Sequence, residues 1–232
     1  MKDYHELAPL VPMELVLRAK QLGSAALCDG MKGLRIERDG CMDAEMLPLE
    51  DRMSMAGTAY TVETKDGDNL PIHVAIYQGK PGYVLVIDGK NYRESPYMGD
   101  LMGGSAKAVG LEGVVLDGLA RDKLGLIELQ LPFFCKGLMQ RGPGKKDLGK
   151  INTPIHCAGI TVHPGDLVVG DADGVTVIPR DRIEEVLLAA ENKLDYEQQR
   201  RDSIELYLRS REAGLPLPTL TPAWVTEMMN GK

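Results

Sequence analysis

The stretch that decides the fold is residues 99–122, GDLMGGSAKAVGLEGVVLDGLARD. It predicts a helix start, a short helix, a buried strand and a tight turn. The helix opens at Gly99-Asp100-Leu101-Met102, where the first backbone N–H groups have no partner within the helix. Such a helix end attracts anions through these free donors and through the helix dipole. The apolar run from Gly113 to Leu116 predicts a core strand.

A charged pair, Arg121-Asp122, follows this strand. Neighbouring residues of a strand point to opposite faces, so the two side chains converge only if the chain has already turned. Asp117-Gly118 supplies suitable turn chemistry. The hypothesis is a small site with free amides for a carboxylate, Arg121 for a second anionic oxygen and Asp122 for a hard metal ion. Two simpler interpretations stay open: the charged pair is a solvated turn, and Asp100 is a helix N-cap.

Composition limits the class of protein. A chain of 232 residues can bury a full core as one domain, or as one domain with long appendages. The net charge of −7 argues against nucleic-acid partners, which need a positive surface. No apolar run approaches the roughly 20 residues of a membrane helix, and the first ten residues lack a signal-peptide core. The four cysteines are widely spaced, so reduced thiols and a cytoplasmic location are expected.

Local patterns predict the remaining elements. Helices are expected at residues 13–31, 70–78 and 124–129. A polar loop is expected at residues 90–98 and an exposed glycine- and lysine-rich loop at 140–152. Strands are expected at residues 56–62, 83–87, 132–135, 155–158, 160–162, 167–169 and 175–178. The last four are short and separated by turn signals, so this section is expected to be antiparallel, which disfavours a purely parallel Rossmann sheet.

A long helix is predicted from Arg180 to about Glu212. At 1.5 Å per residue, ~30 residues span roughly 45 Å, more than a domain of this size can cover. We therefore expect residues 1–179 to form one domain with an N-terminal helix. Residues 180–232, the helix and a proline-containing tail, are expected to contact a neighbouring subunit, with Trp224 as an anchor. A solvated helix end is the alternative.

From Gly67 to about Arg180 the sequence resembles a known family. The residues that carry the resemblance are Gly67-Asp68-Asn69-Leu70, Ile72-His73, Pro81-Gly82, Val84 to Gly89, Gly99-Asp100, Val114 to Asp122, His163 to Val169 and Asp173 to Pro179. They resemble the 4-hydroxy-4-methyl-2-oxoglutarate aldolases and the proteins like regulator of ribonuclease activity A. The resemblance implies an α/β, three-layer β/β/α fold of the swivelling-domain type, with a mixed, largely antiparallel strand section and a long C-terminal helix. It also implies trimers or hexamers with the active site at a subunit interface.

The resemblance further implies Mg²⁺ or Mn²⁺ and cleavage of a 2-oxo acid to pyruvate. Asp122 corresponds to the metal ligand, and Arg121 to the residue that binds the 2-oxo acid and its enolate. Asp100 is expected to orient a water on the metal, and Glu197 of an adjacent subunit is the candidate, by spacing, to complete the water shell. The substrate carboxylate is expected on the backbone of Gly99, Asp100, Leu101 and Met102.

The chemistry of these residues agrees with that implication. Magnesium prefers oxygen ligands and keeps several waters, so one direct carboxylate suffices. Arg121 is always charged and suits a developing enolate oxygen better than lysine does. A Schiff-base mechanism through Lys123 stays open as a minor alternative. Lys136 and Arg141 are possible partners for a distal substrate carboxylate, although a solvated loop accounts for both.

Two functions follow. The first is a class II pyruvate aldolase that acts on a 4-hydroxy-2-oxo acid and also decarboxylates oxaloacetate, since both reactions pass through a pyruvate enolate. The second is a noncatalytic protein-binding regulator, like a ribonuclease inhibitor, on the same fold. The presence of Asp100, Arg121 and Asp122 together favours the enzyme. His73 is expected to be a packed histidine on its helix, and zinc is not expected.

Overall fold

The computed structural model describes residues 3–231, which form two compact units, one ending at Ala190 and one beginning at Glu191. The helices are α1 (Met13–Met31), η1 (Glu37–Gly40), α2 (Leu70–Gln78), α3 (Asp100–Ala108), α4 (Lys123–Glu128), η2 (Arg180–Arg182), α5 (Ile183–Glu212) and α6 (Ala223–Met229). The strands are β1 (Asp3–Tyr4), β2 (Leu47–Pro48), β3 (Met55–Glu63), β4 (Tyr83–Met98), β5 (Gly113–Ala120), β6 (Phe133–Cys135), β7 (Lys150–Ile151), β8 (Ile155–Cys157), β9 (Ile160–Val162), β10 (Leu167–Asp171) and β11 (Gly174–Ile178). No helix within residues 3–231 combines the length and apolarity that crossing a bilayer requires.

The first unit is built on four parallel strands in the order β3-β4-β5-β6. Their β-branched, apolar sequences suit strands that are covered on both faces. Alternate residues enter two separate cores: Leu85 and Ile87 pack on one side of β4, and Val84 and Val86 on the other. The central sheet therefore separates two hydrophobic cores.

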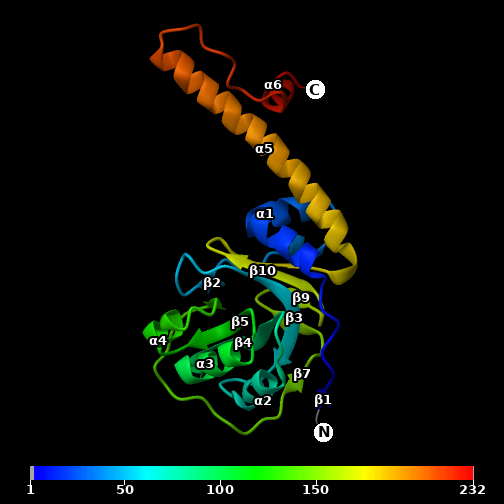
Figure 1. Cartoon of the computed structure of the whole chain (residues 1–232), viewed down its shortest axis with the longest axis vertical. Helices are drawn as coiled ribbons and strands as arrows, with labels where there is room; N and C mark the ends of the chain where they lie inside the picture. The colour runs from blue at the N-terminus through cyan, green and yellow to red at the C-terminus, as the bar shows by residue number, and fades with distance from the viewer. Residues whose placement is uncertain (1–2, 232) are drawn as a thin grey trace. The chain divides into compact units, whose positions relative to one another are not determined.

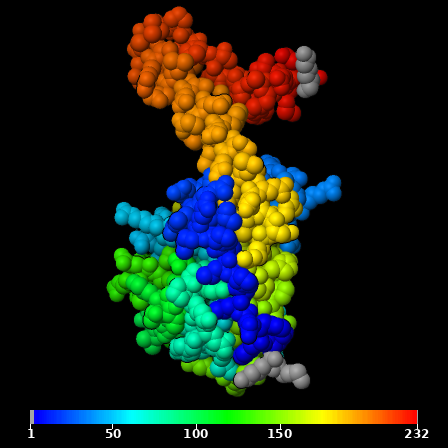
Figure 2. All heavy atoms as spheres, turned by 45° about the vertical axis from the view of Figure 1, so that its right-hand side comes forward, coloured from blue at the N-terminus to red at the C-terminus, as the bar shows by residue number. Residues whose placement is uncertain are grey.

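Two different layers cover the sheet. Helices α2, α3 and α4 lie over one face, while the β8–β9 hairpin and the antiparallel pair β10–β11 cover the other (Figure 1). Strand β10 also pairs antiparallel with β3, which makes the main sheet mixed. The three-layer β/β/α arrangement, the mixed sheet and the long C-terminal helix are confirmed. The segment before α1 extends over the surface of the first unit (Figure 2), where the Val11 amide donates to Thr58 Oγ1.

Two predictions about the strand ends are wrong. The polar segment 90–98 is not a loop, because β4 continues through it to Met98 after an irregularity at Lys90 and Asn91, which have φ angles of 58° and 52°. Asp117-Gly118 is not a turn, because β5 continues to Ala120. Tyr97 lies against the backbone of this extension: a Cβ at Gly118 would come within 2.7 Å of its ring. Pairing between the two extended strands overrides the local turn signal.

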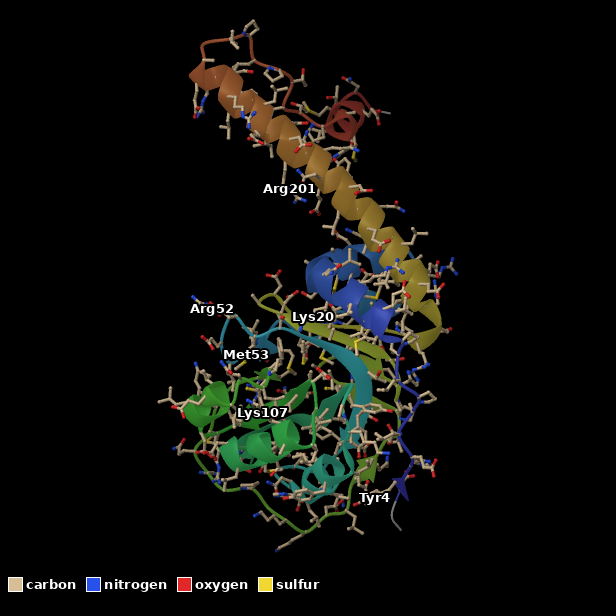
Figure 3. The ribbon with its side chains drawn as sticks, in the orientation of Figure 1. Tyr4, Lys20, Arg52, Met53, Lys107 and Arg201 are labelled. Atoms are coloured by element: carbon tan, nitrogen blue, oxygen red, sulfur yellow. A yellow bond between two sulfur atoms is a disulfide. The ribbon has the colours of Figure 1, made fainter. Side chains whose placement is uncertain are left out.

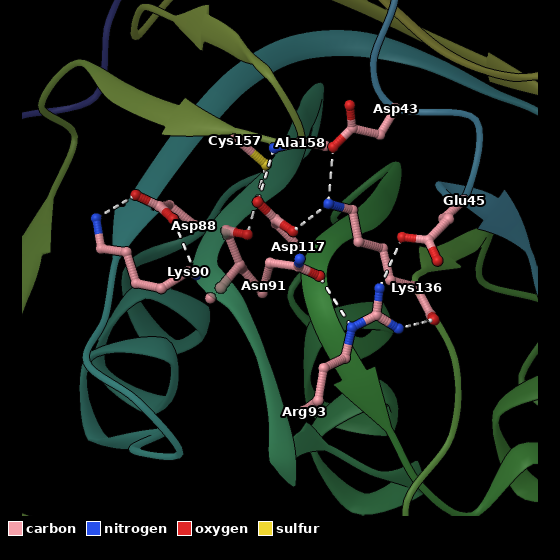
Figure 4. Close-up of polar contacts among 12 residues, drawn as sticks. Asp43, Glu45, Asp88, Lys90, Asn91, Arg93, Asp117, Lys136, Cys157 and Ala158 are labelled. Carbon is pink, nitrogen blue, oxygen red and sulfur yellow. Dashed lines mark hydrogen bonds and ion pairs between the residues drawn. The ribbon is translucent and has the colours of Figure 1, made fainter.

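A buried polar network explains how the charged residue Asp117 can lie inside the sheet (Figure 4). Lys136 Nζ lies 2.9 Å from Asp117 Oδ1 and 2.9 Å from Asp43 Oδ2, and its side chain is only 2% exposed. Asp117 Oδ2 also accepts the Ala158 amide at 2.7 Å, which joins β5 to the covering hairpin. Burial opposes the charge on Lys136, but the two carboxylates outweigh it and raise the pKa of Lys136. The charge of Lys136 is therefore used within the fold. This contradicts the expectation that Lys136 could bind a substrate carboxylate.

The cysteine prediction is also wrong in part. Cys28 of α1 and Cys41, which follows η1, form a disulfide, and their Cα atoms are 6.4 Å apart. The chain reverses between them through η1, a relation that sequence spacing does not reveal. Cys135 and Cys157 are free and buried, and burial raises the pKa of both thiols. The cysteine pattern therefore no longer argues for a reducing compartment.

The second unit contains the later part of α5, the tail and α6. Trp224 Nε1 of α6 donates to the Tyr196 hydroxyl of α5 at 3.2 Å, and Arg200 donates to the Leu220 carbonyl at 2.8 Å. Trp224 remains 54% exposed. Within this unit the tail is thus attached to α5 by a few polar contacts.

Removing the buried cation should destabilise the first unit. We expect Lys136→Met to lower the free energy of unfolding by about 3–5 kcal/mol, because it leaves the buried Asp117 carboxylate without its partner. The measurement is urea denaturation at pH 7. The control is Lys20→Met on the surface of α1 (Figure 3), which should change the free energy of unfolding by less than about 0.5 kcal/mol. Equal effects of the two variants would contradict the structural role of Lys136.

Candidate functional site

The candidate site lies where β4 and β5 end. Parallel strands finish at the same edge of a sheet, and Met98 pairs with Ala120 at this edge. The Arg121 amide donates to the Met98 carbonyl at 2.9 Å, so the residues that follow both strands begin side by side. Helix α3 starts directly after β4, and Asp122 is the N-cap residue of α4. Because a helix follows each strand directly, the starts of α3 and α4 lie at the same edge of the sheet.

The pair Arg121-Asp122 does converge, although no turn precedes it. Asp122 has a left-handed backbone (φ 57°), which brings its Oδ2 atom to 3.2 Å from Arg121 Nε. Aspartate adopts this conformation more readily than most residues. The turn therefore falls within the charged pair itself, later than the sequence predicted.

Gly99 leaves the space that these two side chains occupy. A Cβ atom at position 99 would lie 2.3 Å from Asp122 Oδ2 and 3.1 Å from Arg121 Cγ. Gly99 has an extended backbone, so the requirement for glycine is steric rather than conformational. Gly125 makes similar room for Asp100, whose Cβ would be 2.8 Å from an added Cβ at position 125. Both glycines allow the charged groups to approach the start of α3.

The start of α3 offers free backbone donors. The Gly103 amide makes the first helical hydrogen bond, to the Gly99 carbonyl at 3.0 Å. The Leu101 amide donates to Asp100 Oδ1 at 2.7 Å, so it is already occupied by the neighbouring carboxylate. Within residues 3–231 the amides of Asp100 and Met102 have no acceptor. The amides of Asp100 and Met102 are therefore available for an anion, whereas the Leu101 amide is occupied by the Asp100 carboxylate.

These groups line one small cavity of about 120 Å³. Its volume is below the range of about 300–1,000 Å³ that is usual for drug-sized ligands, so it suits a small acid. All six predicted residues of the first unit line it: Gly99, Asp100, Leu101, Met102, Arg121 and Asp122. Its other walls come from residues that the sequence analysis did not assign to a ligand, including Asn69, His73, Tyr97, Pro143 and Lys145.

Asn69 is the least expected of these residues. Its side chain is 2% exposed, and its Nδ2 donates to the Tyr97 carbonyl at 2.9 Å and contacts Met102 Sδ at 3.3 Å. Its Oδ1 atom has no partner among the described residues. A buried acceptor without a donor is costly unless a ligand or water supplies one. Asn69 was part of the family resemblance, but nothing in its spacing links it to Arg121.

His73 of α2 lies on the same wall. Burial lowers the pKa of His73, and the nearby charge of Lys145 lowers it further, so the imidazole is neutral at pH 7. The glycine-rich loop that carries Lys145 was expected only to be exposed. No local pattern in the sequence indicates that Lys145 lies near His73, because the two residues are distant along the chain.

The remaining candidate residues stand differently. Glu197 belongs to the second unit, where its carboxylate lies 3.4 Å from Arg201 Nη1, and its role from a neighbouring subunit stays a prediction. Lys123 does not line the cavity, which gives the lysine mechanism no support. Arg141 lies 3.7 Å from Glu94 and is also outside the cavity. Neither Lys136 nor Arg141 is therefore placed to bind a distal carboxylate in it.

The donor set fits a magnesium ion better than zinc. Within residues 3–231 no three His, Cys, Asp or Glu side chains gather closely enough to form a metal centre by themselves. Magnesium needs fewer protein ligands, because it keeps several waters and accepts oxygen atoms from substrate. Asp122 offers a carboxylate that is 42% exposed, and it reaches this position because Gly99 has no side chain in its way.

The influence of Lys145 on His73 can be measured. We expect the pKa of His73 to lie below 6.5 and to rise in Lys145→Gln, because that variant removes a nearby positive charge. Lys146→Gln is the matched control and should leave the pKa unchanged, and NMR titration is the measurement. A pKa lower in the folded than in the unfolded chain means that His73 contributes stability above about pH 6.5, lost as the pH falls through the folded value.

The chain is similar to proteins of one known family. Residues 24–177 match the RraA-like family, described as aldolase/RraA. A protein of Halalkalibacterium halodurans, provisionally named 4-hydroxy-4-methyl-2-oxoglutarate aldolase, is 36% identical over 192 residues, 83% of this chain and 89% of that one.

Solved structures are also similar to this chain. Streptomyces coelicolor RraAS2, described as an unusual member of the RNase ES inhibitor RraA family, superposes with a TM-score of 0.74 at 26% identity, covering 85% of this chain and 98% of that chain. An uncharacterized protein from Pseudomonas syringae superposes with a TM-score of 0.75 at 27% identity, covering 87% and 92%. Because the family match covers residues 24–177 and the curated relative spans most of the chain, this protein belongs to the RraA-like (aldolase/RraA) family.

Proposed function

We propose that this protein is a divalent-metal-dependent aldolase that cleaves a 4-hydroxy-2-oxo acid to pyruvate, and that it also decarboxylates oxaloacetate. The observation that carries the proposal is the space at Gly99, which lets Arg121 and Asp122 meet beside the free amides of α3 in one cavity. The name of the H. halodurans relative supports the same class of reaction.

The substrate carboxylate binds at the start of α3. The amides of Asp100 and Met102 donate to it, and the helix dipole adds a favourable field for an anion. Arg121 then faces the 2-oxo group, where its guanidinium stabilises the negative charge that develops on the ketone oxygen. A fixed cation that is always protonated supplies this stabilisation at every physiological pH.

The cleavage step breaks the bond between C3 and C4. The 4-hydroxyl group loses its proton to a water held by Asp100, C4 becomes a carbonyl, and the electron pair of the broken bond forms the pyruvate enolate beside Arg121. Protonation at C3 then gives pyruvate. Asp122 is the residue that would hold Mg²⁺ or Mn²⁺, which when bound polarises the 2-oxo group as a Lewis acid.

The proposal includes a homo-oligomer, a trimer or a hexamer, in which Glu197 of a neighbouring subunit acts with Asp100 on the water. This role comes from the family resemblance, and Glu197 is the candidate for it by its spacing in the sequence. A Glu197→Gln variant that assembles normally and retains full activity would remove Glu197 from the site.

A second function has one observation in its favour. The likeness to RraAS2, a member of an RNase ES inhibitor family, supports a protein-binding regulator on the same fold. A regulator that acts by surface contact has no need for a cavity in which an arginine and two carboxylates meet free amides. We therefore place the aldolase first.

Turnover separates the two functions. We expect the protein to release pyruvate from 4-hydroxy-4-methyl-2-oxoglutarate and from oxaloacetate with Mg²⁺ or Mn²⁺, because both reactions develop the same enolate charge. EDTA should abolish release, and added metal should restore it. A lactate dehydrogenase-coupled assay measures the pyruvate. No turnover of either substrate with either metal would favour the regulator.

Substitutions at the charged pair should abolish most of this activity. We expect Arg121→Lys and Asp122→Ala each to lower kcat/KM by more than a hundredfold, about 2.7 kcal/mol of transition-state stabilisation. Gly99→Ala should also impair turnover, since its Cβ would overlap Asp122 Oδ2. Arg141→Lys and Asp51→Ala, both outside the cavity, are the matched controls and should retain normal rates. Near-normal rates in Arg121→Lys or Asp122→Ala would move the active site elsewhere.

A further inference from the structure

Asp68 is a buried carboxylate next to the candidate site, and the proposed reaction does not use it. Its side chain joins two separate segments. Oδ2 accepts the backbone amides of Lys146 at 2.6 Å and Asp147 at 3.1 Å, and Oδ1 accepts the Leu70 amide at the start of α2 at 2.9 Å. A carboxylate with several backbone donors makes strong, charge-assisted hydrogen bonds. Asp68 therefore connects α2 to a loop that is 78 residues away in the sequence.

Backbone bonds strengthen this connection. The Asn69 amide donates to the Gly144 carbonyl at 3.0 Å, and the Gly144 amide donates to the Gly67 carbonyl at 2.6 Å. At the far end of the loop, an added Cβ at Gly149 would lie 2.3 Å from the Glu63 carbonyl, so the backbone passes close to β3. Residues 143–149, which we call the anchored loop, are thus held at both ends.

The anchored loop contributes two residues to the cavity wall, Pro143 and Lys145. Among the described residues Lys145 has no ion-pair partner, whereas Arg121 is already paired with Asp122. Lys145 lines the same cavity as His73, and its charge contributes to lowering the pKa of His73. The cavity therefore has a second cation that no protein carboxylate neutralises.

We propose that Asp68 is a positioning residue that holds the anchored loop over the cavity, and that Lys145, presented by this loop, selects 4-hydroxy-2-oxo acids that carry a second carboxylate on C4. This inference rests on the proposed aldolase function. Arg121 and the amides of α3 bind the 2-oxo acid group, which all substrates of the class share. Lys145 discriminates among the groups that substrates carry on C4, because a carboxylate there gains a charge-assisted contact that a methyl group lacks.

A matched pair of substrates tests the role of Lys145. 4-Hydroxy-4-methyl-2-oxoglutarate and 4-hydroxy-4-methyl-2-oxopentanoate differ only in a carboxylate or a methyl group on C4. We expect Lys145→Gln to lower kcat/KM about tenfold for the first, mainly through KM, and less than about twofold for the second. The matched control is Lys146→Gln, whose backbone bond to Asp68 does not depend on its side chain. An unchanged ratio between the two substrates in Lys145→Gln would overturn the inference while the aldolase function stands.

Asp68→Asn tests the positioning role, because the carboxamide has one acceptor oxygen in place of two and cannot serve the loop amides and the Leu70 amide together. We expect the same loss of preference for the charged tail, with kcat for the uncharged substrate within about threefold of wild type. The double variant Asp68→Asn/Lys145→Gln should lose no more preference than either single variant, since both act through one contact. Additive losses would show that Asp68 acts by another route.

Two readouts do not depend on turnover. In Asp68→Asn the amides of residues 146 and 147 should exchange with solvent faster, and the pKa of His73 should rise as it does in Lys145→Gln, because Lys145 moves away. If wild type cleaves neither substrate, the aldolase function and the selection of tails both fail, and these NMR readouts alone decide whether Asp68 positions the loop. An unchanged pKa of His73 in Asp68→Asn overturns the positioning role.

Discussion

The parallel pairing of β4 with β5 is the constraint on which the candidate site depends. It places Met98 beside Ala120, and the hydrogen bond from the Arg121 amide to the Met98 carbonyl continues the alignment by one residue beyond the strands. Because the two chains are so close, only glycine fits at position 99 beside Asp122. The approach of two strand ends, rather than any single charged residue, brings the start of α3 to the guanidinium.

The burial of the central sheet on both faces explains the pattern of charge around the site. Helices cover one face and a β layer the other, so a charge within β5 needs partners inside the protein. Asp117 obtains them from Lys136 and from the Ala158 amide. Residues beyond the strand ends are free of this requirement, which is why Arg121 and Asp122 stay partly exposed and available to a ligand. Position along β5 thus separates the buried, paired charge of Asp117 from the partly exposed charges of Arg121 and Asp122.

The wall of the cavity comes from two parts of the chain. The start of α3 and the charged pair come from one continuous stretch, whereas Asn69 and Lys145 come from the turn before α2 and from the anchored loop. Asp68 connects these two later contributions. The proposed selection of substrates thus falls on a loop, and loops accept changes that a packed sheet does not.

The sequence by itself predicted the helix start at Asp100, the strand from Gly113 and the grouping of Arg121 with Asp122, because each depends on neighbours within a few residues. It also predicted α2, the short strands after residue 154 and the long final helix. It failed where distant segments decide: β4 and β5 continue because they pair with each other, and Asp117 is buried because Lys136 neutralises it. Only the tertiary structure placed Lys145 in one wall with Asn69 and His73, since contacts between residues more than 70 positions apart leave no local pattern in a single sequence.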